Sequence, residues 1–125
     1  MTTKSTILVV EDEPVLRKLL RYFLVREGYE VRTAGESLQV FEALQEQRLH
    51  VVLLDIRLPG INGLELLRHI RRTAPEIIIF IISGVLDEAT RMQALAMGAL
   101  ECLEKPLDFR HLQQRLAAAS AITAG

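Results

Sequence analysis

The stretch "TILVVEDEP", Thr6 to Pro14, joins a short apolar run to three consecutive carboxylates and a proline. A short run that is rich in β-branched residues and apolar on both faces is typical of a strand buried within a parallel sheet. Proline suits the first position of a helix. The stretch therefore predicts a buried strand, an acidic turn and a helix, in that order.

The rest of the chain repeats this alternation. Strands are predicted at Thr6–Val10, Tyr29–Ala34, Val51–Asp55, Ile77–Ser83 and Leu100–Lys105. Helices are predicted at Pro14–Glu27, Ser37–Gln47, Leu64–Thr73, Glu88–Met97 and Asp108–Ala119, the last with Asp108 as N-cap. Five β-α units in succession indicate an α/β fold with a parallel sheet, helices on both faces and right-handed crossovers.

Helical spacing also predicts which side chains face the core. In the first helix the expected apolar stripe is Leu16, Leu19, Leu20, Phe23 and Leu24; in the second it is Leu38, Phe41 and Leu44. Arg17, Lys18 and Arg21 lie off the first stripe and form a basic face, which either docks a partner or is an ordinary solvated surface. His50, His69 and His111 have no metal-ligand spacing, and we expect them at the surface.

The composition narrows the class of protein. The chain has 125 residues, which suits one domain, and its net charge of -1 gives no overall basic field for nucleic acid. The single cysteine, Cys102, permits no intrachain disulfide. The longest apolar run, Ile77–Ile82, is much shorter than the roughly 18 residues of a membrane helix, and the N-terminus lacks a signal-peptide pattern. We expect a cytoplasmic domain with no membrane contact.

Polar residues follow four of the predicted strands at the point where each strand ends. Glu11 and Asp12 follow the first strand, whereas Asp55, Ser83 and Lys105 end the third, fourth and fifth. Ligands of open α/β sheets bind outside the carboxyl ends of the strands, so these five side chains are expected to meet at one edge.

This set of side chains restricts the chemistry. Clustered carboxylates repel one another, and a hard divalent cation with oxygen ligands, such as magnesium, removes the conflict. The ammonium of Lys105 and the hydroxyl of Ser83 add a positive charge and a donor. Such a pocket would stabilise a transferring phosphoryl group.

At these residues the chain resembles the receiver domain of two-component response regulators. The matching motifs, in order, are "VVEDEP", "LLDIRLPGINGLELLRHIR", "FIISG" and "ALAMGALECLEKPLD", and they cover nearly the whole length. The resemblance implies a doubly wound, flavodoxin-like (βα)5 sandwich with a five-stranded parallel sheet in the order 2-1-3-4-5. It also implies a receiver domain over residues 1–120, with 121–125 as a flexible tail or the start of a linker.

The resemblance assigns roles to the acidic residues. Asp55 corresponds to the phosphoacceptor and also to a metal ligand, beside Asp12 as the direct ligand and Glu11 assisting through water. The backbone carbonyl of Arg57 completes the protein's ligands for Mg2+ or Mn2+.

Other positions correspond to the phosphoryl contacts and the switch. Lys105 would pair with the phosphoryl oxygens and precede a cis peptide at Pro106, and Ser83 would donate its hydroxyl to the phosphoryl group. Cys102 stands where the family usually has an inward-turning aromatic ring, so coupling would run through Ser83 and the Gly84–Asp87 loop. Arg57 and Val85 occupy the two positions that tune the lifetime of the phosphorylated state.

The implied function is that of a phosphoacceptor in a phosphorelay. A histidine kinase or a histidine phosphotransfer protein would donate the phosphoryl group, and an output domain or a second copy would read the surface of the fourth helix, fifth strand and fifth helix. The domain would catalyse its own phosphorylation and dephosphorylation without being a conventional enzyme, and would not contact nucleic acid directly.

Three alternatives are weighed against this interpretation. A degenerate receiver that only binds partners would normally lack one of the acids, the lysine or the phosphoacceptor. An aspartyl phosphohydrolase needs a second aspartate two positions after the nucleophile, where this chain has Arg57. A flavin binder needs hydroxyl and glycine residues after the first strand, and the "EDEP" turn would repel a flavin phosphate instead.

Overall fold

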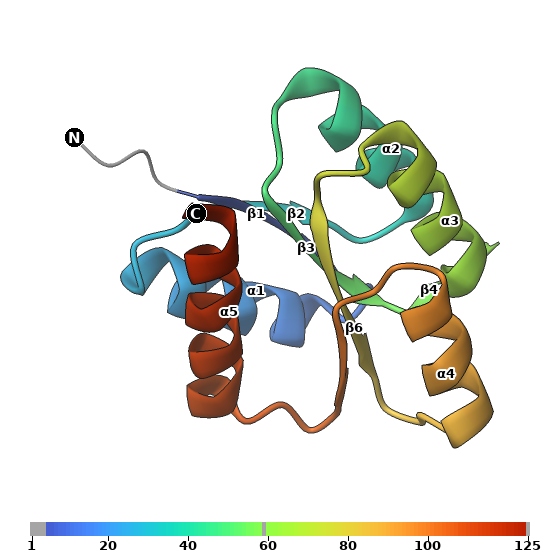
Figure 1. Cartoon of the computed structure of the whole chain (residues 1–125). Coiled ribbons are helices and arrows are strands. Elements are labelled where there is room, and N and C mark those ends of the chain that lie inside the picture. Colours follow the sequence, from blue (N-terminus) through green and yellow to red (C-terminus); the bar gives the residue numbers. More distant parts are fainter. Residues whose placement is uncertain (1–4, 59, 125) are drawn as a thin grey trace.

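The computed structural model describes residues 5–58 and 60–124, which form a three-layered α/β sandwich (Figure 1). The main sheet contains β1 (Thr6–Val10), β2 (Glu30–Ala34), β3 (Val51–Asp55), β6 (Ile78–Ser83) and β7 (Glu101–Glu104). All pairs in this sheet are parallel, and the strand order is β2-β1-β3-β6-β7. The predicted fold class and strand order are therefore confirmed.

The helices follow the predicted alternation closely. They are α1 (Pro14–Arg26), α2 (Ser37–Glu46), α3 (Gly63–Thr73), α4 (Glu88–Ala96) and α5 (Phe109–Ala124). Pro14 occupies the first turn of α1, and the side chain of Asp108 accepts hydrogen bonds from the backbone of Arg110 and His111. Helix α5 continues past the predicted end at Ala119, through an alanine-rich segment that favours helix.

Two short strands were not predicted. β4 (Arg57–Leu58) and β5 (Ile61–Asn62) pair in antiparallel fashion between β3 and α3. A two-residue strand carries no periodicity, which explains why the sequence pattern does not reveal it. The hairpin returns the chain to the sheet edge, where the backbone N–H of Gly63 donates to the carbonyl of Ile56.

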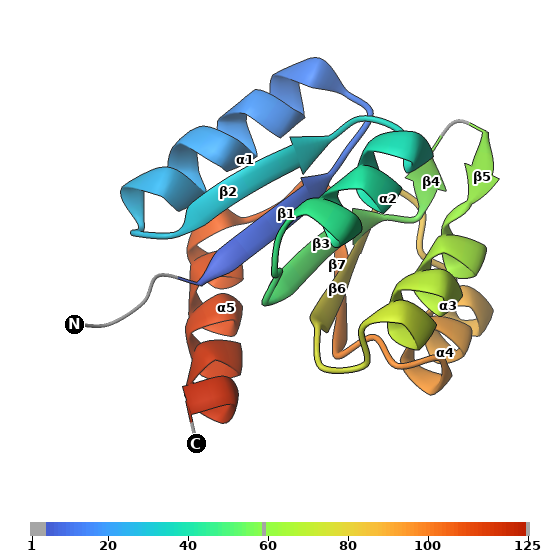
Figure 2. The same ribbon diagram turned by 90° about the horizontal axis from the view of Figure 1, so that it is seen from above.

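Alternate residues of the buried strands face two separate cores. Helices α2, α3 and α4 cover one face of the sheet, and α1 and α5 cover the other (Figure 2). For example, Leu8 and Leu54 pack toward α2 and α3, whereas Val9 and Leu53 pack toward α1 and α5. Because the five strands are parallel, their carboxyl ends lie along one edge of the sheet, between the two helical layers.

Two residues of the predicted apolar stripes are not in the core. Leu19 is 52 % exposed and Leu38 is 59 % exposed, whereas Val40 and Ala43 form the buried part of α2. Both misplaced leucines lie on the border of a stripe, where helical periodicity alone does not decide between core and solvent. Helix α1 therefore carries an exposed apolar side chain close to the carboxyl edge.

One histidine also differs from expectation. His50 is half-buried, and its Nδ1 accepts a hydrogen bond of 2.9 Å from the backbone N–H of Thr6. His69 and His111 are exposed, as expected. Across the described residues, no helix has the length and apolar content that crossing a membrane requires.

Candidate phosphoacceptor and metal site

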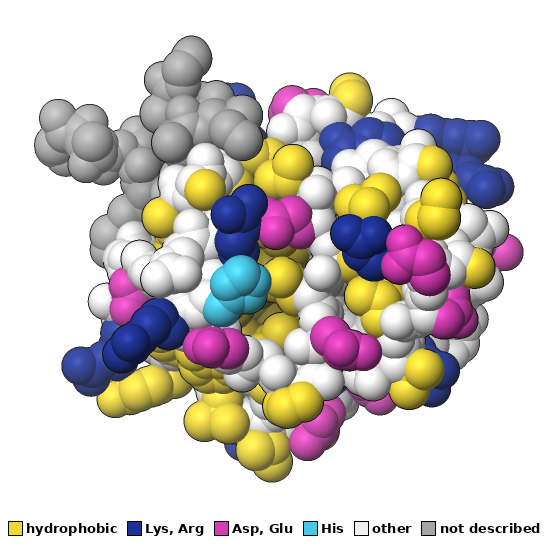
Figure 3. All heavy atoms as spheres, turned by 60° about the horizontal axis from the view of Figure 1, so that its bottom comes forward, with side chains coloured by type: hydrophobic (Ala, Val, Ile, Leu, Met, Phe, Trp, Pro, Cys, Tyr) yellow, Lys and Arg dark blue, Asp and Glu magenta, His cyan; other side chains and the backbone are white. Residues whose placement is uncertain are grey.

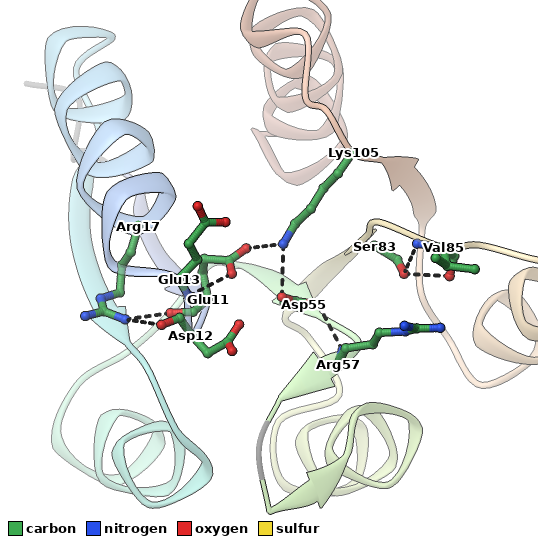
Figure 4. A network of polar contacts seen from close by, with 9 residues as sticks. All are labelled: Glu11, Asp12, Glu13, Arg17, Asp55, Arg57, Ser83, Val85 and Lys105. Atoms are coloured by element: carbon green, nitrogen blue, oxygen red, sulfur yellow. Dashed lines mark hydrogen bonds and ion pairs between the residues drawn. The ribbon is translucent and has the colours of Figure 1, made fainter.

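Three carboxylates meet at the carboxyl edge of the sheet. Glu11, Asp12 and Asp55 each place a carboxylate oxygen so that the three oxygens lie within 4.8 Å of one another. Glu11 and Asp12 follow β1, and Asp55 is the last residue of β3, which lies beside β1. Parallel pairing thus brings together acids that are distant in sequence (Figure 4).

Lys105 supplies the positive charge of this cluster. It follows β7 directly, and its backbone N–H donates to the carbonyl of Ser83 at 2.7 Å. Its Nζ lies 2.6 Å from Glu11 Oε1 and 3.1 Å from Asp55 Oδ2. The peptide between Lys105 and Pro106 is cis, the isomer that the family resemblance implies.

Burial shapes the electrostatics of this ion pair. Glu11 is completely buried, and this raises the pKa of its carboxyl above 4.5 despite the opposing effects of Lys105 and of the Glu13 N–H. Burial alone would lower the pKa of Lys105, but its contacts with Glu11 and Asp55 outweigh that effect and raise the pKa. Burial thus disfavours the ionised form of Glu11, whereas the two neighbouring carboxylates favour the charged form of Lys105.

Asp55 is held in place by two donors. The backbone N–H of Arg57 donates to Oδ1 at 2.9 Å, and Lys105 donates to Oδ2 at 3.1 Å. The side chain of Arg57 is exposed and points away from the cluster (Figure 4). Asp55 is only 3 % exposed, and its carboxylate points toward Lys105 (Figure 4).

Ser83 lies at the same edge, but its hydroxyl is engaged elsewhere. The Oγ donates to the carbonyl of Val85 at 2.8 Å and accepts from the Val85 N–H at 3.3 Å. The serine is completely buried, whereas the side chain of Val85 is 58 % exposed. A contact between Ser83 and a group on Asp55 would require the hydroxyl to exchange this partner in the following loop.

Cys102 lies on β7, paired with Ile81, and packs partly against the core on the α2, α3 and α4 side. Burial raises the pKa of its thiol, so the thiolate is disfavoured. These surroundings are those of a small apolar residue on an edge strand.

The donor set suits a hard divalent cation. All three clustered side chains offer oxygen, and together the three carboxylates carry more negative charge than the ammonium of Lys105 offsets. Magnesium prefers oxygen ligands and keeps several waters, so few carboxylates are sufficient. The residues present therefore fit a magnesium ion.

Arg17 is a residue of this site that the sequence pattern assigned to a free basic face. Its Nη1 donates to the carbonyl oxygens of Glu11 at 2.8 Å and Asp12 at 3.3 Å. In the sequence, the feature that could have indicated this contact is the position of Arg17 one turn into α1, from which a long side chain can reach back to the acidic turn. A solvated arginine has the same spacing, so the contact only emerges in three dimensions.

A parallel sheet whose carboxyl edge gathers three carboxylates and a lysine is the arrangement that the resemblance to receiver domains of two-component signalling implies. A model of the response regulator receiver domain matches residues 7–117, and the chain belongs to this family.

Curated relatives are regulators of transcription. The chain is 44 % identical over 120 residues to the transcriptional regulatory protein AruR of Pseudomonas aeruginosa, covering 92 % of this chain and 49 % of AruR. It is 37 % identical over 110 residues to the TorCAD operon transcriptional regulatory protein TorR of Escherichia coli, covering 88 % and 47 %. The chain spans about half the length of these relatives.

Solved structures have the same fold. The receiver domain of NtrX from Brucella abortus is 36 % identical with a TM-score of 0.85, covering 90 % of this chain and 96 % of that one. A response regulator from Burkholderia pseudomallei, solved with a phosphorylated aspartic acid, a calcium ion and citrate, is 27 % identical with a TM-score of 0.85, covering 97 % and 72 %.

Proposed function

We propose that Asp55 accepts a phosphoryl group from a phosphohistidine of a histidine kinase or a histidine phosphotransfer protein, in a reaction that depends on Mg2+ or Mn2+. The observation that carries this proposal is the convergence of Glu11, Asp12, Asp55 and Lys105 at one sheet edge. The related Burkholderia regulator was solved with a phosphorylated aspartic acid, which supports the same chemistry here.

The side chains have distinct roles in this proposal. Asp12 and Asp55, together with the carbonyl of Arg57, hold the metal, and Glu11 assists through water. When bound, the metal neutralises negative charge that develops on the phosphoryl oxygens. Lys105 already touches Asp55 and is positioned to contact the same oxygens.

The transfer of the phosphoryl group to Asp55 is a displacement at phosphorus. A carboxylate oxygen of Asp55 forms a bond to phosphorus while the bond between phosphorus and the donor's imidazole nitrogen breaks, and the imidazole keeps that electron pair. Hydrolysis by water later restores the carboxylate and releases inorganic phosphate. The domain thus catalyses both its own phosphorylation and its own dephosphorylation.

Phosphorylation is read at a surface beyond the pocket. The phosphoryl group gives Ser83 a new acceptor, so its hydroxyl leaves Val85 and the Gly84–Asp87 loop changes conformation. This shifts an existing equilibrium at α4, β7 and α5, where an output domain or a second copy binds. Cys102 stands where the family usually has an aromatic ring, so the conformational change is transmitted mainly through Ser83.

An apolar groove beside the pocket suits the phosphodonor. It has a volume of about 590 Å³ and lies between the start of α1 and the loop before α5. Its lining comprises Glu13, Val15, Leu16, Leu19, Lys105, Pro106, Leu107 and Phe109. Figure 3, in which the carboxyl edge comes forward, shows hydrophobic side chains gathered at the lower left of that face. A donor helix seated here would present its histidine close to Asp55.

We also propose the bounds and setting of the domain. Residues 1–120 form the receiver, and 121–125, of which 121–124 continue helix α5, lead into a tail or linker. Because relatives of the chain regulate transcription, the output is a transcriptional response in the cytoplasm, and nucleic acid is contacted by the output element rather than by this domain.

The experiment is incubation with acetyl phosphate or phosphoramidate and Mg2+, followed by mass measurement of the intact protein. Wild type should gain the mass of one phosphoryl group, and Asp55→Ala should gain none. An equal gain in Asp55→Ala, or no gain in wild type, would contradict the proposal. If the chain is a degenerate receiver, which binds partners without being phosphorylated, the wild-type protein should gain no mass.

A further inference from the structure

We propose that Arg17 is a positioning residue for the metal-binding carboxylates, and that Gly35 is small in order to leave its guanidinium in place. This inference rests on the proposed metal site at Glu11, Asp12 and Asp55. It gives Arg17 a role in holding that site, in place of the two roles that the sequence left open for it, docking of a partner and an ordinary solvated surface.

The contacts show how the guanidinium acts. Nη1 of Arg17 donates to the backbone carbonyls of Glu11 and Asp12, at 2.8 Å and 3.3 Å (Figure 4). It thereby ties the turn after β1 to α1, which packs on the sheet through Leu20 and Leu24. The contact uses carbonyl oxygens and takes up no carboxylate oxygen, so the acidic side chains stay available to the pocket.

Two further hydrogen bonds hold this turn, and both involve Glu11. On the inner side, the backbone N–H of Glu11 donates to the carbonyl of Ala34 at 2.9 Å, and Glu11 Oε2 accepts from the N–H of Glu13 at 3.1 Å. The carboxylate of Asp12 is exposed, and its position depends on the backbone that carries it. Fixing both carbonyls therefore fixes the direction in which Asp12 leaves the turn.

Gly35 provides the space for Arg17. A Cβ on Gly35 would lie 2.8 Å from Arg17 Nη1, closer than real Cβ contacts, and the next atom outside Arg17, on Gln39, would be 3.7 Å away. Gly35 does not have a positive φ, so alanine fits its backbone conformation. Gly35→Ala should therefore displace the flexible end of Arg17 and leave its charge intact.

Charge and positioning predict opposite effects on metal binding. A guanidinium near the pocket repels a cation, so its removal should tighten Mg2+ binding if only charge matters. If Arg17 positions the turn, its removal should weaken binding instead. Loss of groups that orient metal ligands typically weakens binding by 10- to 100-fold, and we expect about tenfold for Arg17→Gln.

The experiment follows the backbone amides of residues 10–13 and 55–57 by NMR while Mg2+ is titrated into metal-free protein. The variants are Arg17→Gln, Gly35→Ala and the double variant, with Lys18→Gln as the matched control. Lys18 is exposed on the same helix. Its replacement removes one positive charge, as Arg17→Gln does, but leaves the hydrogen bonds from Arg17 to the acidic turn in place. Amide hydrogen exchange in the turn, measured without metal, provides a readout that does not depend on activity.

Arg17→Gln and Gly35→Ala should both weaken Mg2+ binding and speed amide exchange at residues 11–13, and the double variant should be no weaker than Arg17→Gln. Lys18→Gln should bind Mg2+ as wild type does, or slightly more tightly. Unchanged or tighter binding by Arg17→Gln, or additive losses in the double variant, would overturn the inference. Absence of binding by wild type would instead overturn the metal site on which it rests.

Discussion

The ammonium of Lys105 lies 2.6 Å from the carboxylate of Glu11, a residue with no exposed surface. The same ammonium lies 3.1 Å from Asp55. One lysine thus balances two carboxylates, and Asp12 lies beside them. The pocket therefore has more negative than positive charge, which favours the binding of a cation. Several measurable properties of the protein depend on this excess of negative charge.

Glu11→Gln should stabilise the metal-free protein near neutral pH. The pKa of Glu11 is raised in the folded state, mainly by burial, whereas the unfolded chain ionises near 4.5. The ionised carboxylate therefore destabilises the fold above its folded pKa, and this effect disappears as pH falls toward 4.5. Lys105 keeps its contact with Asp55 in the variant, so we expect the free energy of unfolding to rise on the order of 1 kcal/mol.

Denaturant unfolding of wild type and Glu11→Gln in EDTA, over a range of pH, measures this effect. The difference should be largest near neutral pH and shrink toward pH 4.5. Saturating Mg2+ should stabilise wild type more than the variant, because the ion binds the folded state. A difference that does not vary with pH would show that burial of this carboxylate is not its cause.

Gly63→Ala should strongly destabilise the fold. A Cβ at this position would lie 2.2 Å from the carbonyl oxygen of Ile56 and 2.5 Å from its Cα, and a backbone contact of this kind cannot relax by rotation of a side chain. We expect a loss of roughly 1–3 kcal/mol, typical of overpacking. Gly84→Ala is the control, since its Cβ would have no atom within 4 Å, and it should change stability by less than about 0.5 kcal/mol.

Leu19→Glu should slow phosphoryl transfer from a protein donor but not from acetyl phosphate. Leu19 is 52 % exposed and lines the apolar groove beside the pocket. Val25→Glu is the matched control, because Val25 is 51 % exposed on the same helix but lies outside that groove. Equal slowing by both variants, or slowing with acetyl phosphate, would argue against docking in the groove.

Arg57→Asn should shorten the lifetime of the phosphorylated state. Arg57 is exposed and its backbone N–H donates to Asp55; its side chain points away from the cluster in this structure, and on turning toward the phosphorylated Asp55 it would hinder the attacking water. A several-fold faster loss of the phosphoryl group, followed by mass or by 31P NMR, is the expected result. Equal lifetimes would assign the control of hydrolysis to another residue.

Ser83→Ala should separate phosphorylation from switching. The Ser83 hydroxyl is bonded to Val85 in this structure, so its loss removes the group that exchanges partner when Asp55 is phosphorylated. The variant should still accept a phosphoryl group from acetyl phosphate. Its amide shifts in α4 and β7 should then change much less than those of wild type, and wild-type shift changes would place the coupling elsewhere.

The sequence by itself determined the fold class and the members of the acidic cluster. β-branched runs such as Val51–Asp55 form strands through local preference and burial on both faces, and parallel strands necessarily bring their carboxyl ends to one edge. The positions of Glu11, Asp12, Asp55 and Lys105 at that edge follow from this rule alone. The strand order came from the family resemblance, because composition does not reveal it.

The tertiary structure decided which neighbour each side chain contacts. Helical and strand spacing describes one segment at a time and does not show how two segments pack. Packing between segments decides the exposure of Leu19, the hydrogen bond from Thr6 to His50 and the contact of Arg17 with the acidic turn. Local sequence sets backbone preference, whereas a side chain's partner depends on distances across the fold. The same arginine on the same helix would be a solvated charge if the turn after β1 lay a few ångströms away.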